Sequence, residues 1–349
     1  MINNSFFSTE ILRWFRENGR DLPWRETKDP YAIWLSEIIL QQTRIVQGWE
    51  YWERFMQTYP KVEDLAAASE DDVLKLWQGL GYYSRARNLH AAAKQIVALG
   101  SFPNTLDGIK SLKGVGDYTA AAIGSFAFDI PAAVVDGNVY RVLSRYFGID
   151  TPINSTQGKK EFAALAQSLL PASDAASYNQ GMMDFGAIQC TPQSPKCLLC
   201  PLAETCEALR SGRVEELPVK NKTVKVKTRH LSYIYIRCKS SVADGAENTE
   251  PMIAIHRRGE GDIWQGLWEP YNVSDVKELP SFVKNPILLA KDVKHVLTHR
   301  ILLADFYLLE TETCPQLPDD YIWIKESEIE DYGVPRLIEI MLEKINPAE

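Results

Sequence analysis

The chain has 349 residues, of which 45% are hydrophobic and 24% charged. This composition is ordinary for a globular protein, and the length suggests two domains. The start shows no secretory signal, and no stretch approaches the roughly 20 apolar residues that a membrane span needs. The formal net charge of −8 argues weakly against nucleic-acid binding, but a nearly neutral domain can still present a basic face. We therefore expect a cytoplasmic protein.

Residues 5–210 are predicted to be almost entirely helical. Apolar residues recur at helical spacing, and Gly and Pro residues separate the runs. Pro30 suits the first turn of a long helix, which we expect to extend to Tyr51. The expected helices cover residues 11–16, 30–51, 62–68, 70–78, 84–99, 117–127, 137–147, 158–170 and 174–186.

The sequence pattern changes near residue 212. Residues 213–229 lack helical periodicity and end in VKNKTVKVKTR, which has five basic residues and no acidic one. We interpret them as an exposed basic linker. Strands are predicted at 231–238, 252–258, 301–310 and 321–325, followed by a helix at 334–345. We therefore predict a multidomain chain, with an all-α domain at 1–212 and an α+β domain at 230–349.

Four of the six cysteines lie in one short segment, with the spacing Cys-x6-Cys-x2-Cys-x5-Cys. In a reducing compartment, clustered cysteines are typical of metal ligands rather than of disulfides. Zinc sites usually have two separated Cys-x2-Cys pairs, whereas a compact segment suits a [4Fe–4S] cluster with one thiolate per iron. We predict one [4Fe–4S] cluster, with zinc or an unligated loop as the alternatives. The predicted ligands are Cys190, Cys197, Cys200 and Cys206, whereas Cys238 and Cys314 are scattered.

A Gly-x-Gly turn lies between two predicted helices, in the order Lys113, Gly114, Val115 and Gly116. Two glycines allow the backbone to approach another chain closely, and the helix that follows adds its N-terminal N–H donors. The turn therefore predicts a sequence-independent grip on a nucleic-acid phosphate. A plain connection between two helices is the alternative.

Two carboxylates lie in unusual surroundings. Glu37 lies in the apolar run IWLSEIIL, where it occupies either a solvated stripe or a dry pocket. A dry pocket would raise its pKa and suit a general acid. Asp136 follows an apolar run and precedes a predicted helix, so a capping role is the alternative to a catalytic one.

Several motifs spread along the chain resemble a known family. The chain is similar to the helix–hairpin–helix base-excision DNA glycosylases, which include endonuclease III, and more closely to the MutY-type adenine DNA glycosylases. Its C-terminal part resembles a Nudix fold that recognises 8-oxoguanine. The motifs are DLPWR (21–25), WLSEIILQQT (34–43), GLGYYSRARNLH (79–90), LKGVGDYTA (112–120), VVDGNVYRVLSR (134–145), HRRGEGDIWQGLWEPY (256–271) and HVLTHRIL (295–302).

The resemblance implies a function in base-excision repair. The enzyme would remove adenine mispaired with 8-oxoguanine or guanine from double-stranded DNA, and we expect it to act as a monomer, near the nucleoid in a bacterium. Glu37 would protonate the adenine, and Asp136 would stabilise the cationic sugar. Tyr118 and Asn138 would orient these groups. The resemblance also places Arg25 and Asp184 around them.

The resemblance further implies how the lesion is reached. Flipping adenine out of the duplex leaves a gap, which Gln42 and Tyr82 would fill. Thr298 and His299 would contact 8-oxoguanine. The C-terminal domain should not hydrolyse nucleotides, because it lacks the Glu-rich helix that binds magnesium. The remaining expected lesion-binding residues are Leu40, Gln41, Thr43 and Leu80.

Related glycosylase/lyases have a lysine that forms a Schiff base with the sugar. Here Tyr118 occupies that place, which predicts an enzyme without strong strand cleavage. An oxidised-pyrimidine glycosylase/lyase, an iron–sulfur redox sensor that binds DNA and a nucleotide pyrophosphatase are the rival interpretations.

Overall fold

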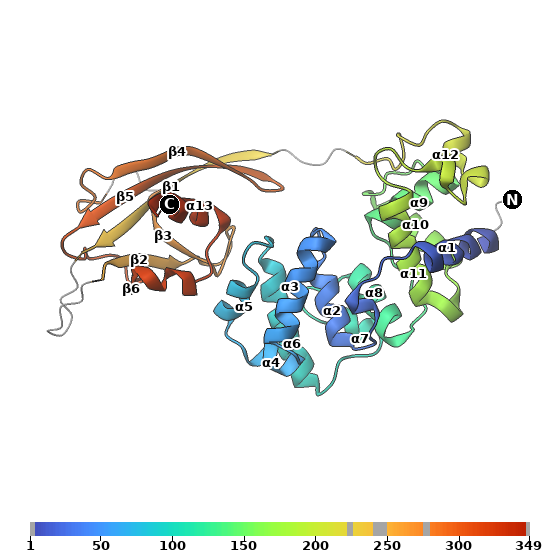
Figure 1. Ribbon diagram of the computed structural model, residues 1–349, viewed down its shortest axis with the longest axis horizontal. Coiled ribbons are helices and arrows are strands. Elements are labelled where there is room, and N and C mark those ends of the chain that lie inside the picture. The colour runs from blue at the N-terminus through green and yellow to red at the C-terminus, as the bar shows by residue number, and fades with distance from the viewer. Residues whose placement is uncertain (1–3, 222–225, 240–249, 275–279, 347–349) are drawn as a thin grey trace. The chain divides into compact units, whose positions relative to one another are not determined.

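The computed structural model describes all residues except 1–3, 222–225, 240–249, 275–279 and 347–349 (Figure 1). Residues 222–225 of the predicted basic linker therefore lie outside the described residues. The chain forms two compact units. One comprises Met1–Ala66 with Ala91–Lys222, and the other comprises Ala67–His90 with Thr223–Glu349. The domain boundaries predicted from the sequence, at residues 212 and 230, stay a prediction.

The N-terminal part of the chain is helical, as predicted. None of the described helices is both long and apolar enough to cross a membrane. A single π-helical turn, Phe185–Gln189, continues α11. The α-helices are α1 (Asn4–Asn18), α2 (Pro30–Ile39), α3 (Ile45–Thr58), α4 (Val62–Ala67), α5 (Glu70–Leu76), α6 (Ser84–Leu99), α7 (Leu106–Lys110), α8 (Asp117–Phe128), α9 (Gly137–Phe147), α10 (Thr156–Leu169), α11 (Ala175–Asp184) and α12 (Glu207–Arg210).

The single helix predicted from 30 to 51 is wrong. The helix ends at Ile39, and α3 begins at Ile45. Between them Gln42 has a φ of 58°, in the left-handed region, which an α-helix cannot contain. The predicted start at Pro30 is confirmed. Asp29 caps α2 there by accepting a hydrogen bond from Tyr31 N.

Helix α2 is apolar except for Ser36 and Glu37, and every residue from Tyr31 to Ile39 is buried. Such a helix has to lie inside a helical bundle. One apolar cluster joins Ile33 of α2 to Ala122 and Phe126 of α8. A second cluster packs α1 against α9, α10 and α11. Because α2, α8 and α9 belong to packed cores, the polar side chains at their ends have fixed positions.

The second unit contains a six-stranded sheet in the order β4-β5-β1-β3-β2-β6. Strands β1 and β5 are parallel along their whole length, whereas the other pairs are antiparallel. Helix α13 (Arg336–Ile345) packs against the sheet through Leu337, Ile338 and Met341 (Figure 1). The strands are β1 (Lys227–Cys238), β2 (Met252–Arg257), β3 (Trp268–Asn272), β4 (Ile287–Val296), β5 (Arg300–Thr311) and β6 (Tyr321–Lys325).

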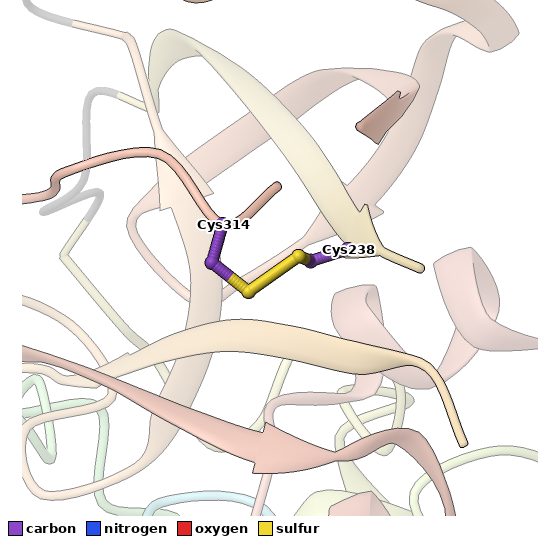
Figure 2. Close-up of a disulfide and its surroundings, with 2 residues drawn as sticks. All are labelled: Cys238 and Cys314. Atoms are coloured by element: carbon purple, nitrogen blue, oxygen red, sulfur yellow. A yellow bond between two sulfur atoms is a disulfide. The ribbon is translucent and has the colours of Figure 1, made fainter. Parts of the chain in front are cut away.

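The predicted α+β class of this unit is confirmed, and the predicted strands are present, although β3 and β4 were missed. A disulfide joins Cys238 at the end of β1 to Cys314 beyond β5, with 5.2 Å between the Cα atoms (Figure 2). The sequence had left these two cysteines without a role. The disulfide fastens the segment after β5 to the strand beside it.

Candidate active site

A cavity of about 630 Å³ opens in the first unit. Its walls come from α2 and the turn after it, from the start of α8, from the start of α9 and from α11. Most of the predicted catalytic residues lie around it. The lining includes Arg25, Glu37, Tyr118, Asp136 and Asn138, together with Leu40, Gln41, Gln42 and Thr43.

Glu37 lies on α2 and is 6% exposed. The Tyr118 hydroxyl donates a hydrogen bond to Glu37 Oε2 at 3.0 Å. Burial raises the pKa of Glu37 from 4.5 to about 7, and the Tyr118 hydrogen bond and the Arg25 charge only partly oppose this rise. The carboxyl is therefore poised to hold or release a proton near neutral pH.

Asp136 is the N-cap residue of α9. Its carboxylate accepts hydrogen bonds from Asn138 N at 2.9 Å, Val139 N at 2.8 Å and Asn138 Nδ2 at 2.8 Å. Burial raises the pKa of Asp136 above its ordinary value, and the hydrogen bonds from these donors offset only part of the rise. Asp136 therefore does cap the helix, as the capping alternative predicted. The same carboxylate also lines the cavity. The donors and the start of α9 favour its anionic form.

The Tyr118 phenol is nearly buried. Burial, with the nearby Glu37 charge, raises its pKa well above 10. It therefore stays neutral and acts as a hydrogen-bond donor to Glu37. No amine occupies this position.

Arg25 lines the cavity, and an ion pair with Asp184 holds its side chain in place. Arg25 Nη1 and Nη2 each donate to Asp184 at 2.8 Å, a bidentate arrangement. Arg20 also donates to the same carboxylate. Asp184 is fully buried, which alone would raise its pKa, but the hydrogen bonds from the two arginines hold the pKa below its usual value. Asp184 does not line the cavity itself; it fixes the residue that does.

Arg141 and Gly186 support the site, and the sequence analysis missed both. Arg141 Nη2 donates to Asn138 Oδ1 at 2.8 Å, and its Nε donates to the Cys190 carbonyl at 2.7 Å. A Cβ on Gly186 would lie 2.5 Å from Asn138 Cβ, so only glycine fits there. A hint in the sequence was available for Arg141 alone, because it lies one helical turn after Asn138.

The four clustered cysteines line one cavity. Cys190 follows the π-helical turn, Cys197 and Cys200 bracket a short 3-10 turn, and Cys206 precedes α12. Arg145 Nη1 donates to Cys190 Sγ at 3.4 Å, which suits a thiolate ligand. Among the described residues, no three His, Cys, Asp or Glu side chains surround a single-ion site. The thiols enclose a volume, and this arrangement fits a [4Fe–4S] cluster, with one thiolate for each iron.

The predicted phosphate grip forms the turn between α7 and α8. Gly114 has a φ of 78°, and Gly116 is the N-cap residue of α8. Lys113, Gly114 and Gly116 are exposed, whereas Val115 is buried. Nothing lies within 4 Å of a Cβ placed on Gly116. The turn thus presents open backbone at a helix start.

The predicted lesion-binding residues are divided between the units, with Leu40, Gln41, Gln42 and Thr43 at the first cavity and the residues predicted to contact 8-oxoguanine in the second unit. Thr298 and His299 lie in the turn between β4 and β5 and line a cavity of about 930 Å³ with Tyr82. The Tyr82 and Thr298 hydroxyls are 2.5 Å apart. Tyr82 has a φ of 48° and is half exposed. Leu80 is instead buried and does not line this cavity.

Models of three known families match three separate segments of the chain. A model of the HhH-GPD superfamily of base excision DNA repair proteins matches residues 35–171. A model of the iron–sulfur binding domain of endonuclease III matches residues 190–206. A NUDIX domain model matches residues 246–344.

Individual proteins are similar over longer stretches. An adenine DNA glycosylase of Buchnera aphidicola subsp. Schizaphis graminum is 31% identical over 350 residues, covering 97% of this chain and 98% of that protein. An adenine DNA glycosylase of Mus musculus is 42% identical over 226 residues, covering 61% of this chain and 44% of that protein. The solved structure of a thermostable thymine-DNA glycosylase has a TM-score of 0.56 at 34% identity, covering 60% of this chain and 97% of that one.

Proposed function

The chain belongs to the adenine DNA glycosylases, base-excision repair enzymes that hydrolyse an N-glycosyl bond, and we propose that its substrate is adenine mispaired with 8-oxoguanine or guanine. One observation carries the chemical part of the proposal. A buried carboxyl with a raised pKa and an anchored carboxylate line the same cavity. The cavity of the second unit supports the choice of mispair.

In the proposed reaction, Glu37 is the general acid. Its proton passes to N7 of the flipped adenine, so that the base leaves as a neutral molecule with the electron pair of the glycosidic bond. Tyr118 donates to Oε2, which leaves Oε1 to carry the proton. Glu37 then accepts a proton from the water that adds to C1′. The acid is thereby regenerated within one turnover.

Asp136 stabilises the cationic sugar in this proposal. Loss of the base leaves positive charge on C1′ and the ring oxygen, and a nearby anion lowers the energy of that state. Three hydrogen bonds fix the Asp136 carboxylate, so it needs no reorganisation as the charge develops. Asn138 positions it, and Arg141 positions Asn138.

Arg25 and Asp184 would set the environment of the acid. The Arg25 charge lowers the pKa of Glu37 against the effect of burial. Asp184 holds Arg25 at the wall through two hydrogen bonds. Because Tyr118 stands where a lyase would have a lysine, the enzyme should leave an abasic site without forming a Schiff base.

Binding of the duplex would involve several surfaces. The open backbone from Lys113 to Gly116 would hold a phosphate, and Gln42 and Tyr82 would fill the gap left by the flipped base. Thr298 and His299 would contact 8-oxoguanine. The [4Fe–4S] cluster, which can serve as a structural or redox group, would cross-link the segment from 190 to 206 through its four cysteines. We propose that the enzyme acts as a monomer.

A single-turnover assay tests the proposal. Three duplexes are compared, containing adenine opposite 8-oxoguanine, adenine opposite guanine, or thymine glycol opposite adenine. We expect fastest base release from the first, slower release from the second and none from the third, without strand cleavage. Excision confined to thymine glycol would overturn the proposed substrate. A strong covalent adduct after borohydride treatment would overturn the absence of a Schiff base.

A further inference from the structure

Residues 67–90 are part of the same compact unit as the C-terminal sheet. Arg257 Nη2 lies 2.9 Å from Glu70 Oε1 and 3.1 Å from Asp71 Oδ1 on α5. A Cβ placed on Gly266 would meet Leu74 Cδ1 at 3.1 Å, so the turn around Gly266 packs tightly against α5. The segment that carries Tyr82 is therefore attached to the sheet domain by charge and by close packing.

Arg87 provides a further attachment, at the edge of the cavity that Thr298 and His299 line. Its Nη1 donates to the Gln265 carbonyl at 2.6 Å, and its Nη2 donates to Gln265 Oε1 at 3.3 Å. One planar guanidinium thus holds both the backbone and the side chain of the same residue. A lysine, with a single ammonium group, cannot reproduce this fork.

The turn that Arg87 holds is conformationally demanding. Trp264 has a φ of 60°, which a residue with a bulky side chain adopts only when its surroundings enforce it. Two backbone hydrogen bonds, from Gly266 N to Arg258 O and from Leu267 N to Trp264 O, close the turn. The grip of Arg87 on Gln265 lies directly beside Trp264 in the chain.

Trp264 forms one wall of the same cavity as Thr298 and His299. Its ring lies 5.8 Å from the ring of His295, measured between centroids, and His295 lines the cavity as well. The cavity lining thus combines an aromatic ring with hydroxyl and imidazole groups, a set that is suited to a planar purine, which stacks on its face and is distinguished at its edge. The position of this wall depends on the turn that Arg87 holds.

We propose that Arg87 is a positioning residue for discrimination of the base opposite adenine. It acts by fixing Trp264 in the wall of the cavity that Thr298 and His299 line, which we call the reading cavity. This inference rests on the proposed function, because it assumes that the cavity receives the oxidised purine. Arg87 itself does not contact the reacting atoms. Its loss should weaken the preference for 8-oxoguanine over guanine and leave the chemistry unchanged.

The test compares Arg87→Met with Arg87→Lys and with Lys94→Met. Lys94 is an exposed residue of the same helix, so its variant controls for a lost positive charge. Single-turnover rates and binding are measured on the 8-oxoguanine and guanine duplexes. Arg87→Met should lower the ratio of the two rates by about fivefold to tenfold, comparable to the loss of one or two hydrogen bonds. Arg87→Lys should recover part of the ratio, and Lys94→Met should keep it.

Three results would overturn the inference. They are an unchanged ratio in Arg87→Met, an equal fall on both duplexes, and a uniform loss of binding with a weaker salt dependence, the last being typical of a phosphate contact. A double variant adds a further check. If Arg87 acts through Trp264, then Arg87→Met should change the ratio no further in a Trp264→Ala background. Absence of any preference in the unmodified enzyme would instead contradict the proposed function.

Discussion

The cavity of the first unit and the cavity of the second unit are built in different ways. The first contains Glu37 and Asp136, and each carboxyl is held by specific donors. The second is lined by aromatic rings, hydroxyl groups and imidazoles beside the charged Arg87, Asp262 and Arg300, and the link between Tyr82 and Thr298 is a contact between two neutral groups. Bond breaking requires fixed charges in a dry site, whereas reading a base requires a flat wall and a few polar atoms.

This comparison predicts that substitutions in the two cavities have effects of different size and kind. In the first cavity they should change the chemical step, because they remove a proton or a charge. In the second cavity they should change only the choice between mispairs. The experiments below follow from this contrast, beginning with the largest expected effect.

Glu37→Gln should lower the single-turnover rate of adenine release by about 10³-fold or more, because the amide N–H of glutamine is far too weakly acidic to protonate the base. Binding of the duplex should change little, since the amide keeps nearly the same size. Gel shift and rapid quench measure the two quantities. Glu63→Gln, at an exposed position on α4, is the matched control. A rate within tenfold of the unmodified enzyme would exclude Glu37 as the acid.

Glu37 should also make the protein less stable as the pH rises. Its pKa is about 7 in the folded state against an ordinary 4.5, so its contribution to stability is fully present below about 4.5 and is lost as the pH rises to 7. The loss corresponds to about 3 kcal/mol. The free energy of unfolding of Glu37→Gln minus that of the unmodified protein should grow by about this amount between pH 4.5 and 7.5. Urea titrations that gave a constant difference would contradict the raised pKa.

The rate of base release should depend on pH in the same direction. Glu37 acts in its protonated form, so the single-turnover rate should fall as the pH rises through about 7. Well above that value the fall approaches about tenfold for each pH unit. At low pH the rate should fall as well, because Asp136 has to be ionised. A rate that stays level from pH 7 to 9 would mean that another group supplies the proton.

Thr298→Val should have the smallest effect of the four. It removes one hydroxyl from the reading cavity, and the preference for 8-oxoguanine over guanine should fall by about fivefold. The rate on the guanine duplex should remain unchanged. Thr58→Val, at the exposed end of α3, is the control. If the variant lost activity equally on both duplexes, the contrast between the two cavities would fail.

Much of the site could be predicted from sequence because its residues lie at the ends of regular helices. Glu37 stands out as a charge in an apolar run, and Asp136 as an acid before a helix. These local patterns single out both carboxylates but left a solvated stripe and a capping role open, and it was the resemblance to the glycosylases that assigned them catalytic roles, which stay a prediction. The cysteine spacing is a local pattern as well, since four ligands of one cluster lie close together in the chain.

The features that were missed depend on conformation or on distant contacts. Residues 40–44 read Leu-Gln-Gln-Thr-Arg and contain neither Gly nor Pro, so no turn signal marked the left-handed Gln42 that lies between α2 and α3. Strand β4 is largely exposed and its pairing with β5 is irregular, which weakens the alternation expected of a strand. The need for glycine at 186 comes from Asn138, which is far away in sequence.

The Cys238–Cys314 disulfide has a consequence for how damage to the backbone would be detected. The two cysteines are 76 positions apart, and strands β2, β3, β4 and β5 lie between them. A protease that cuts the chain once within this interval leaves two fragments that are still covalently joined. On a denaturing gel the nicked protein would migrate near its full size until a reductant separated the fragments. An apparently intact band is therefore no measure of backbone integrity unless the thiols have first been reduced.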